Sequence, residues 1–87
     1  MNYFKILREE AGLSQSTVAK KLGYSTPQFI SNWERHLSLP PINAIKKMSK
    51  MYKEPAERIF SAILYTEIYN LRKKRFAEFK KLQKSKG

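Results

Sequence analysis

The chain has 87 residues with no cysteine and one histidine, and its 18 lysines and arginines against 7 acidic residues give a formal net charge of +11. This length allows one small domain with a modest core, and the absence of cysteine excludes a disulfide framework and a thiolate metal site. The charge favours a polyanionic partner, nucleic acid ahead of an anionic membrane. No apolar run approaches the ~20 residues of a membrane span and no signal-peptide core is present, so a cytoplasmic location is expected.

The first predicted helix spans residues 2–11 and ends at Gly12. Its apolar side chains recur at helical spacing. They are Tyr3, Phe4, Leu7 and Ala11.

Two short helices joined at an angle are predicted between Leu13 and Glu34. Ser14 can cap a helix that opens at Gln15, and Gly23 suits the left-handed residue that ends it. The helix buries one apolar face. This face consists of Val18, Ala19 and Leu22.

The second helix of this pair begins near Pro27, because proline after a hydroxyl residue suits a first helical turn. Ile30 and Trp33 share one side, and Trp33 is expected in the core rather than on a base-stacking surface. Core packing is the plainer expectation for Phe29, whereas the family resemblance given below implies that it faces partly outward, over the turn or into a groove. The pattern is that of a helix-turn-helix.

A proline-bearing loop, residues 35–40, separates this unit from two further helices. Pro41 is expected in the first turn of a fourth helix, and a fifth is expected from near Pro55 to about Gln83, since no glycine or proline interrupts it. The apolar positions of the fourth helix are spaced for burial. They are Ile42, Ile45, Met48 and Tyr52. The predicted fold is therefore all-α, with five helices and an extended basic C-terminal helix.

The C-terminal helix carries an apolar stripe that runs beyond the predicted body, residues 1–65, into the extension, residues 66–87. Ile59 and Ile63 lie on another face, suited to pack on the body. Because an isolated apolar helix is marginal in water, the stripe is expected to pair with a second subunit; the alternative is a frayed basic tail that raises nonspecific affinity. The predicted dimerisation residues are Leu64, Ile68, Leu71, Phe79 and Leu82, in line with Phe60.

The ordered set of motifs resembles the Cro and lambda-type repressor (XRE-like) helix-turn-helix family. The resemblance covers roughly residues 3–65 and implies an α-helical domain that binds operator DNA. The matching residues are Leu7-Arg8, Gly12-Leu13-Ser14-Gln15, Ala19, Leu22-Gly23, Ile30-Ser31, Trp33-Glu34-Arg35 and the apolar helix after Pro41. The chain departs from the family in its turn, where Glu34 follows Gly23 by eleven residues instead of ten, and at His36, where relatives often have glycine.

The exposed front of the third helix is the expected reading surface, because glutamine and asparagine can pair with adenine, and threonine or proline can touch a thymine methyl. The expected base contacts are Thr26, Pro27, Gln28, Ser31 and Asn32. The expected phosphate contacts are Gln15, Arg35, His36 and Ser38. The plainer interpretations are an ordinary first-turn residue for Gln15, a helix cap for Thr26 and a solvated side chain for Ser31. By the resemblance, Arg8 and Glu34 form an ion pair that fixes the recognition helix.

The sequence therefore predicts a dimeric, sequence-specific transcriptional regulator. It is expected to be a repressor that occupies a palindromic operator on double-stranded DNA. No catalytic constellation, metal site or cofactor site is predicted. The alternative within this class is an antitoxin that regulates its own synthesis, since the resemblance implies the same fold for such proteins. Two other classes stay open: an interaction module whose basic tail binds RNA or an acidic protein, and a surface binder of anionic membranes through residues 66–84.

Overall fold

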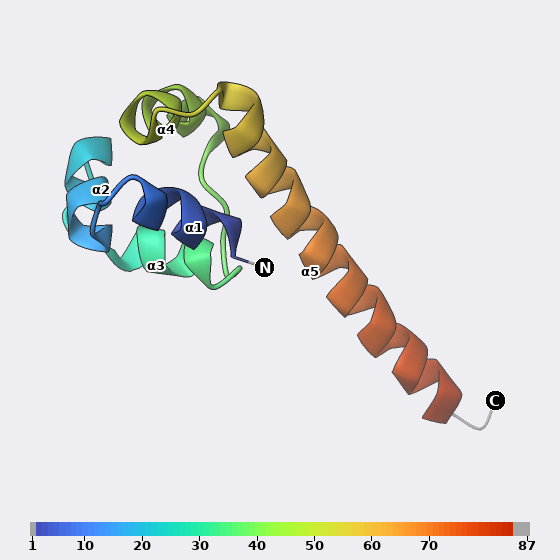
Figure 1. Ribbon diagram of the computed structural model, residues 1–87. Helices are drawn as coiled ribbons and strands as arrows, with labels where there is room; N and C mark the ends of the chain where they lie inside the picture. The colour runs from blue at the N-terminus through green and yellow to red at the C-terminus, as the bar shows by residue number, and fades with distance from the viewer. Residues whose placement is uncertain (1, 85–87) are drawn as a thin grey trace.

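The computed structural model describes residues 2–84, and every regular element in them is helical. The elements are α1 (Tyr3–Glu10), α2 (Gln15–Leu22), α3 (Gln28–Glu34), the short 3-10 helix η1 (Ile42–Ala44), α4 (Ile45–Tyr52) and α5 (Ala56–Lys84). Helices α1 to α4 form a body from which α5 projects as a long arm (Figure 1). The predicted all-α fold with five α-helices and an extended C-terminal helix is confirmed. Residues 85–87 of the predicted extension lie outside the described residues.

Local capping determines where α2 begins and ends. The Ser14 hydroxyl accepts a hydrogen bond from the Thr17 amide at 3.1 Å, as an N-cap residue should. Gly23 ends the helix with φ +89°, a left-handed conformation that glycine adopts without a steric penalty. The Gly23 and Tyr24 amides then donate to the last carbonyls of the helix, those of Lys20 and Ala19. The predicted boundaries of this helix are confirmed.

One hydrophobic core joins all the helices of the body to the start of α5. Removing this apolar surface from water is the main stabilising term of the fold. The core residues are Phe4, Leu7, Val18, Ala19, Ile30, Trp33, Ala44, Met48, Tyr52, Ile59, Ala62 and Ile63. Ile59 and Ile63 therefore pack α5 on the body, as the sequence predicted.

The start of the fourth helix differs from the prediction. Pro41 is extended, with ψ 146°, and the chain then makes the 3-10 turn η1 before α4 begins at Ile45. A 3-10 turn has about 3.0 residues per turn, so it places side chains at other angles than an α-helical turn would. Ile42, predicted to be buried, is 64% exposed, and Ala44 occupies the core in its place.

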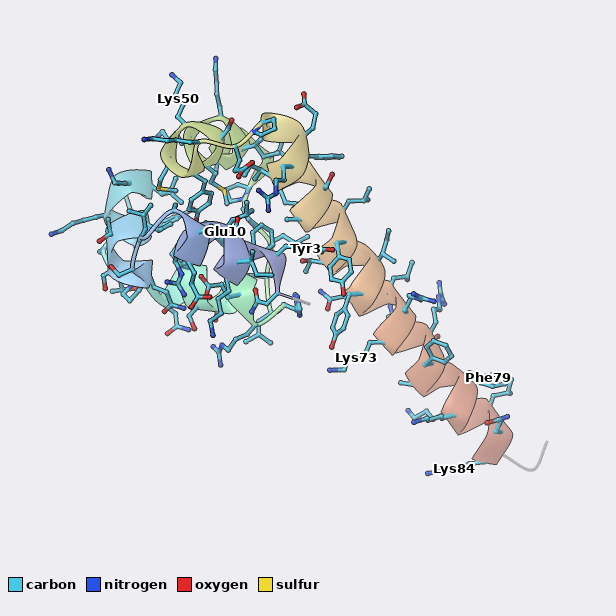
Figure 2. The ribbon with its side chains drawn as sticks, viewed as in Figure 1. Tyr3, Glu10, Lys50, Lys73, Phe79 and Lys84 are labelled. Carbon is cyan, nitrogen blue, oxygen red and sulfur yellow. The ribbon has the colours of Figure 1, made fainter. Side chains whose placement is uncertain are left out.

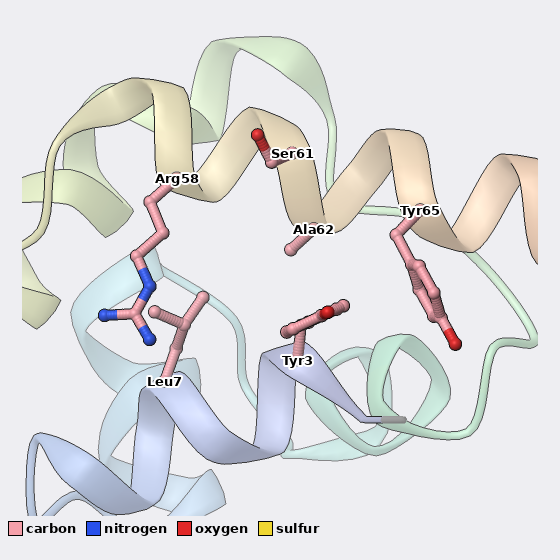
Figure 3. A pocket seen from close by; sticks show the side chains of 6 residues that line it. All are labelled: Tyr3, Leu7, Arg58, Ser61, Ala62 and Tyr65. Carbon is pink, nitrogen blue, oxygen red and sulfur yellow. The ribbon is translucent and has the colours of Figure 1, made fainter.

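The N-terminal part of α5 packs beside α1 (Figure 3). The rings of Tyr3 and Tyr65 meet edge to face with centroids 4.9 Å apart, a favourable arrangement for aromatic pairs. Arg58 of α5 forms ion pairs with Glu54 and, at 3.4 Å, with Glu10 of α1. These contacts add to the buried packing of Ile59 and Ile63, which holds the start of α5 on the body.

Beyond Thr66 every described residue of α5 is exposed, although the helix continues for a further 18 residues to Lys84. The predicted boundary at residue 65 thus falls inside one continuous helix. The apolar stripe is unpaired in the single chain: Leu64, Ile68 and Leu71 are each about half exposed. Among the described residues, no helix has the combination of length and apolar character needed to cross a membrane.

Candidate nucleic-acid interface

Helix α3 turns one side to the core and the other to solvent. Ile30 and Trp33 are buried, so the predicted core position of Trp33 is confirmed. Phe29 is 52% exposed and packs on Tyr24 in the preceding turn, with ring centroids 4.8 Å apart. The core placement of Phe29 is therefore wrong, and the outward one holds.

The turn between α2 and α3 is held by aromatic packing. Tyr24 contacts Phe29 on one side and Trp33 on the other, the latter edge to face with centroids 5.9 Å apart. Because Trp33 is buried in the core, this chain of rings connects the turn to the centre of the body. The turn, which the resemblance predicts to hold one extra residue, is thus packed against the rest of the fold.

A row of polar side chains runs along the exposed side of α3. The Gln28 amide nitrogen donates to the Asn32 side-chain oxygen at 2.9 Å, and the Arg35 guanidinium donates to the same oxygen at 3.1 Å. The spacing of four and three residues places the three side chains on one face of the helix. The Asn32 amide nitrogen and the Gln28 amide oxygen make no hydrogen bond within residues 2–84, which leaves a donor and an acceptor for a ligand.

The other expected base-contact residues lie at the start of this row. Thr26 and Pro27 are exposed just before α3, and Ser31 is half-buried within it. The Thr26 hydroxyl accepts a long hydrogen bond of 3.4 Å from the Gln28 backbone amide, whereas the N-cap of α3 is Pro27, which makes no side-chain cap hydrogen bond. All five expected base-contact residues therefore lie on or beside the exposed side of one helix.

Arg8 and Glu34 meet at the far side of α3, with Arg8 Nε 2.6 Å from Glu34 Oε2 and a second nitrogen 3.1 Å from Oε1. Both side chains are largely buried, at 12% and 5% exposure. The Glu34 hydrogen bond, opposed by desolvation, raises the pKa of Arg8 above its usual value. This two-pronged contact joins the end of α1 to the end of α3.

Gln15, an expected phosphate contact, is engaged inside the protein. Its amide nitrogen donates to Glu34 Oε1 at 3.1 Å, so Gln15 joins α2 to the same carboxylate that binds Arg8. The side chain is partly buried. Helix α3 is thereby attached to both preceding helices at one point.

His36 lies against α5 rather than in open solvent. Its φ of +62° explains why glycine suits this position. The imidazole packs on Tyr69 with ring centroids 4.7 Å apart. The backbone carbonyl of His36 accepts a hydrogen bond of 3.2 Å from the Asn70 side chain. Burial, with a smaller contribution from Lys73, lowers the pKa of His36, so its charged form is disfavoured in this position.

Two residues make contacts that the sequence analysis did not predict. Arg35 was expected only as a contact to the DNA backbone, yet its guanidinium donates a hydrogen bond to Asn32 on the exposed side of α3. Arginine in that place can bind guanine edges, and its spacing of three from Asn32 was a visible signal. Asn70, which holds His36, gave no signal because the two are 34 positions apart. Ser38 is exposed in the loop after α3.

A short amphipathic helix that is fixed at several points to a compact body, and that presents a row of amides and a guanidinium to solvent, defines a DNA-binding helix-turn-helix module. A family model described as helix-turn-helix matches residues 4–59. The chain therefore belongs to the XRE/Cro-like helix-turn-helix family, a family of DNA-binding regulators. Comparison with curated proteins and with solved structures gave no match. Within residues 2–84 no group of acidic or histidine side chains is arranged to hold a metal ion.

Proposed function

We propose that this protein is a sequence-specific transcriptional regulator that binds a palindromic operator as a homodimer and represses by occupying it. Helix α3 enters the major groove, where Gln28, Asn32 and Arg35 contact base edges. Thr26, Pro27 and Ser31 contribute from the start of the same surface. Arg35 and the neighbouring loop also reach the phosphate backbone.

The observation that carries this proposal is the row Gln28–Asn32–Arg35, whose three side chains are joined by hydrogen bonds on the exposed side of α3. Side chains that already share hydrogen bonds lose less freedom on binding. The same helix is attached to α1 and α2 through Glu34. A surface held in this way can distinguish bases by geometry, because its side chains cannot move to form hydrogen bonds with a base pair of the wrong pattern.

The homodimer is supported by the apolar stripe of α5. Ile68, Leu71 and Phe79 are each about half exposed, on a helix that leaves the body. Monomeric soluble proteins rarely expose a long contiguous apolar surface. Pairing of two α5 helices would cover it and would fix the separation of the two α3 helices.

Selection of binding sites from a random duplex pool, followed by sequencing, tests the function. A two-fold symmetric motif is expected. Gln28→Ala and Asn32→Ala should each weaken binding to the selected site by about 1–3 kcal/mol and leave binding to a scrambled duplex nearly unchanged. Lys50→Ala, on the exposed side of α4, is the control.

Failure would be clear in either part of this experiment. A pool that converges on no motif would contradict sequence-specific recognition. If Gln28→Ala and Asn32→Ala bound the selected motif as tightly as the unmodified protein does, α3 would not be the reading surface.

A further inference from the structure

One face of α5 changes character along its length. Residues spaced alternately by three and four lie on one side of a helix, and the series that begins at Ile59 can be followed to the end of α5. It reads Ile59, Ile63, Thr66, Asn70, Lys73, Ala77, Lys80 and Lys84. Its first three members are buried on the body and the rest are exposed. The face that packs on the body thus becomes basic where the helix leaves the body.

The change takes place beside the end of α3. Asn70 donates to the His36 carbonyl at 3.2 Å, and Tyr69 packs on the His36 ring, so α5 passes the residue that ends the recognition helix. Lys73 follows one turn later. Figure 2 shows Lys73 and Lys84 on the side of α5 towards the body and Phe79 on the opposite side.

The lysines of this face have no compensating charge. Residues 70–84 contain seven lysines and arginines and one acidic residue, Glu78. Glu78 is paired with Arg75 at 3.3 Å. Within the described part of the chain, Lys73, Lys80 and Lys84 form no ion pair. A row of unpaired cations at helical spacing suits a polyanion that runs alongside the helix.

The arrangement favours duplex DNA over a membrane surface. A helix that lies in a membrane interface buries its apolar face and keeps its cations near the headgroups around that face. Here the three lysines lie opposite the apolar stripe, so burying the stripe in lipid would point them towards water. On the other hand, they lie on the side of α5 that continues past the end of α3, beside the expected path of the DNA backbone.

We propose that Lys73, Lys80 and Lys84 of α5 form a second DNA contact, which binds phosphates of the duplex next to the major-groove site of α3. This contact rests on the proposed function, because it requires α3 to place the DNA. It is sequence-independent and acts by neutralising phosphates, while the opposite face of the same helix pairs with the second subunit. The arm thus serves both affinity and assembly.

The salt dependence of binding tests the contact. Affinities of the full-length protein with K73Q, K80Q and K84Q combined are measured for the selected operator and for a scrambled duplex from about 50 to 200 mM salt. Each lost phosphate contact lowers the slope of log affinity against log salt by about 0.9. The triple variant should therefore lose about 2 to 3 from the slope for each bound subunit, which is about 5 for the homodimer, on both duplexes and keep its preference for the operator.

The matched control removes the same charge elsewhere. K46Q, K47Q and K50Q change three exposed lysines of α4, and Lys50 lies on the side of the molecule away from α3 (Figure 2). This control should keep the original slope. Equal losses in the two triples would overturn the proposal, because they would reflect net charge alone. An unchanged slope in the α5 triple would also overturn it. So would a loss of affinity of the α5 triple that is seen only with anionic phosphatidylserine vesicles and not with DNA.

The outcome is separable from that of the proposed function. If α3 did not read sequence, the operator preference would be absent in the unmodified protein. If only the α5 contact were wrong, the preference would be present and the slope of the α5 triple would equal that of the α4 control.

Discussion

Glu34 accepts hydrogen bonds from two side chains that are far away in the sequence, Arg8 and Gln15. Its carboxylate is 5% exposed, so it depends on these partners for the interactions that water would otherwise supply. The Asn2 side chain also donates to the Glu34 backbone carbonyl. One buried residue at the end of α3 therefore joins the N-terminal segment, α1 and α2 to this helix.

Removing Arg8 should be costly because it leaves this carboxylate buried without its counter-charge. We expect Arg8→Ala to lower the free energy of unfolding by about 3 kcal/mol, measured by urea denaturation. The control is Arg58→Ala, which removes an arginine from the exposed pairs with Glu54 and Glu10 and should change stability little. Equal effects of the two substitutions would contradict a special role for the buried pair.

Tyr52 should make stability depend on pH in the alkaline range. Burial, with a smaller contribution from Glu34, raises its pKa from 10.0 to about 12. Above pH 10 the unfolded chain releases the phenolic proton while the folded protein keeps it, so stability falls as the pH rises. The contribution of the protonated Tyr52 hydroxyl to the free energy of unfolding is present in full below pH 10 and is lost as the pH approaches 12.

The size of this loss is about 2–3 kcal/mol for a shift of this order. Tyr52→Phe has no phenolic proton, so its stability should fall less steeply between pH 10 and 12 than that of the unmodified protein. Urea denaturation at half-unit pH intervals measures both curves. Parallel curves would show that the Tyr52 hydroxyl does not titrate differently in the folded and unfolded states.

At the scale of elements, α5 combines three surfaces on one helix. Its first turns are buried on the body, one outer face is apolar and the face that follows the body is basic. A single helix with an exposed apolar stripe is marginal in water, yet α5 is fixed at its start by the core and by Asn70. The remaining stripe is the surface that a second subunit would cover.

Replacing two residues of the stripe tests this pairing. Ile68→Gln combined with Leu71→Gln should shift the protein from dimer to monomer in analytical ultracentrifugation, because both side chains are exposed in the single chain and would be buried only between subunits. Ala77→Gln, on the opposite face, is the control and should stay dimeric. A double variant that remains dimeric would place the subunit contact elsewhere.

At the scale of the whole molecule, the length of α5 would determine how far the proposed DNA-binding surface extends. The helix has 29 residues, about 43 Å at ~1.5 Å per residue, and the longest axis of the molecule is 52 Å. In a two-fold dimer paired through the stripe, the two bodies lie on outer sides of the helix pair. A rigid connection of this kind allows only certain separations of the two recognition helices.

Half-site spacing in the operator should therefore be strict. The centres of the half-sites are expected one helical turn apart, about 10 bp, or a multiple of it. Insertion of ~5 bp between them turns one half-site to the opposite side of the duplex and should reduce affinity to that of a single half-site in a gel-shift titration. Equal affinity for both spacings would mean that the two bodies are flexibly connected or bind independently.

Much of the molecule follows from local sequence signals. Ser14 and Gly23 determine the ends of α2 because a capping hydroxyl and a left-handed residue act within a few positions of themselves. The apolar spacing of Ile59 and Ile63 indicates which side of α5 is buried. The composition predicts a polyanionic partner, and the ordered motifs from Leu7 to Arg35 indicate the family.

Other features were decided only by tertiary structure. The exposure of Ile42 depends on a 3-10 turn whose different angular spacing brings Ala44 into the core. The engagement of Gln15 by Glu34 and the packing of His36 on Tyr69 join residues distant in sequence, so no local pattern contains them. The position of the basic face of α5 relative to α3 likewise depends on tertiary structure, because it is the contact of Asn70 with His36 that holds α5 beside the end of α3.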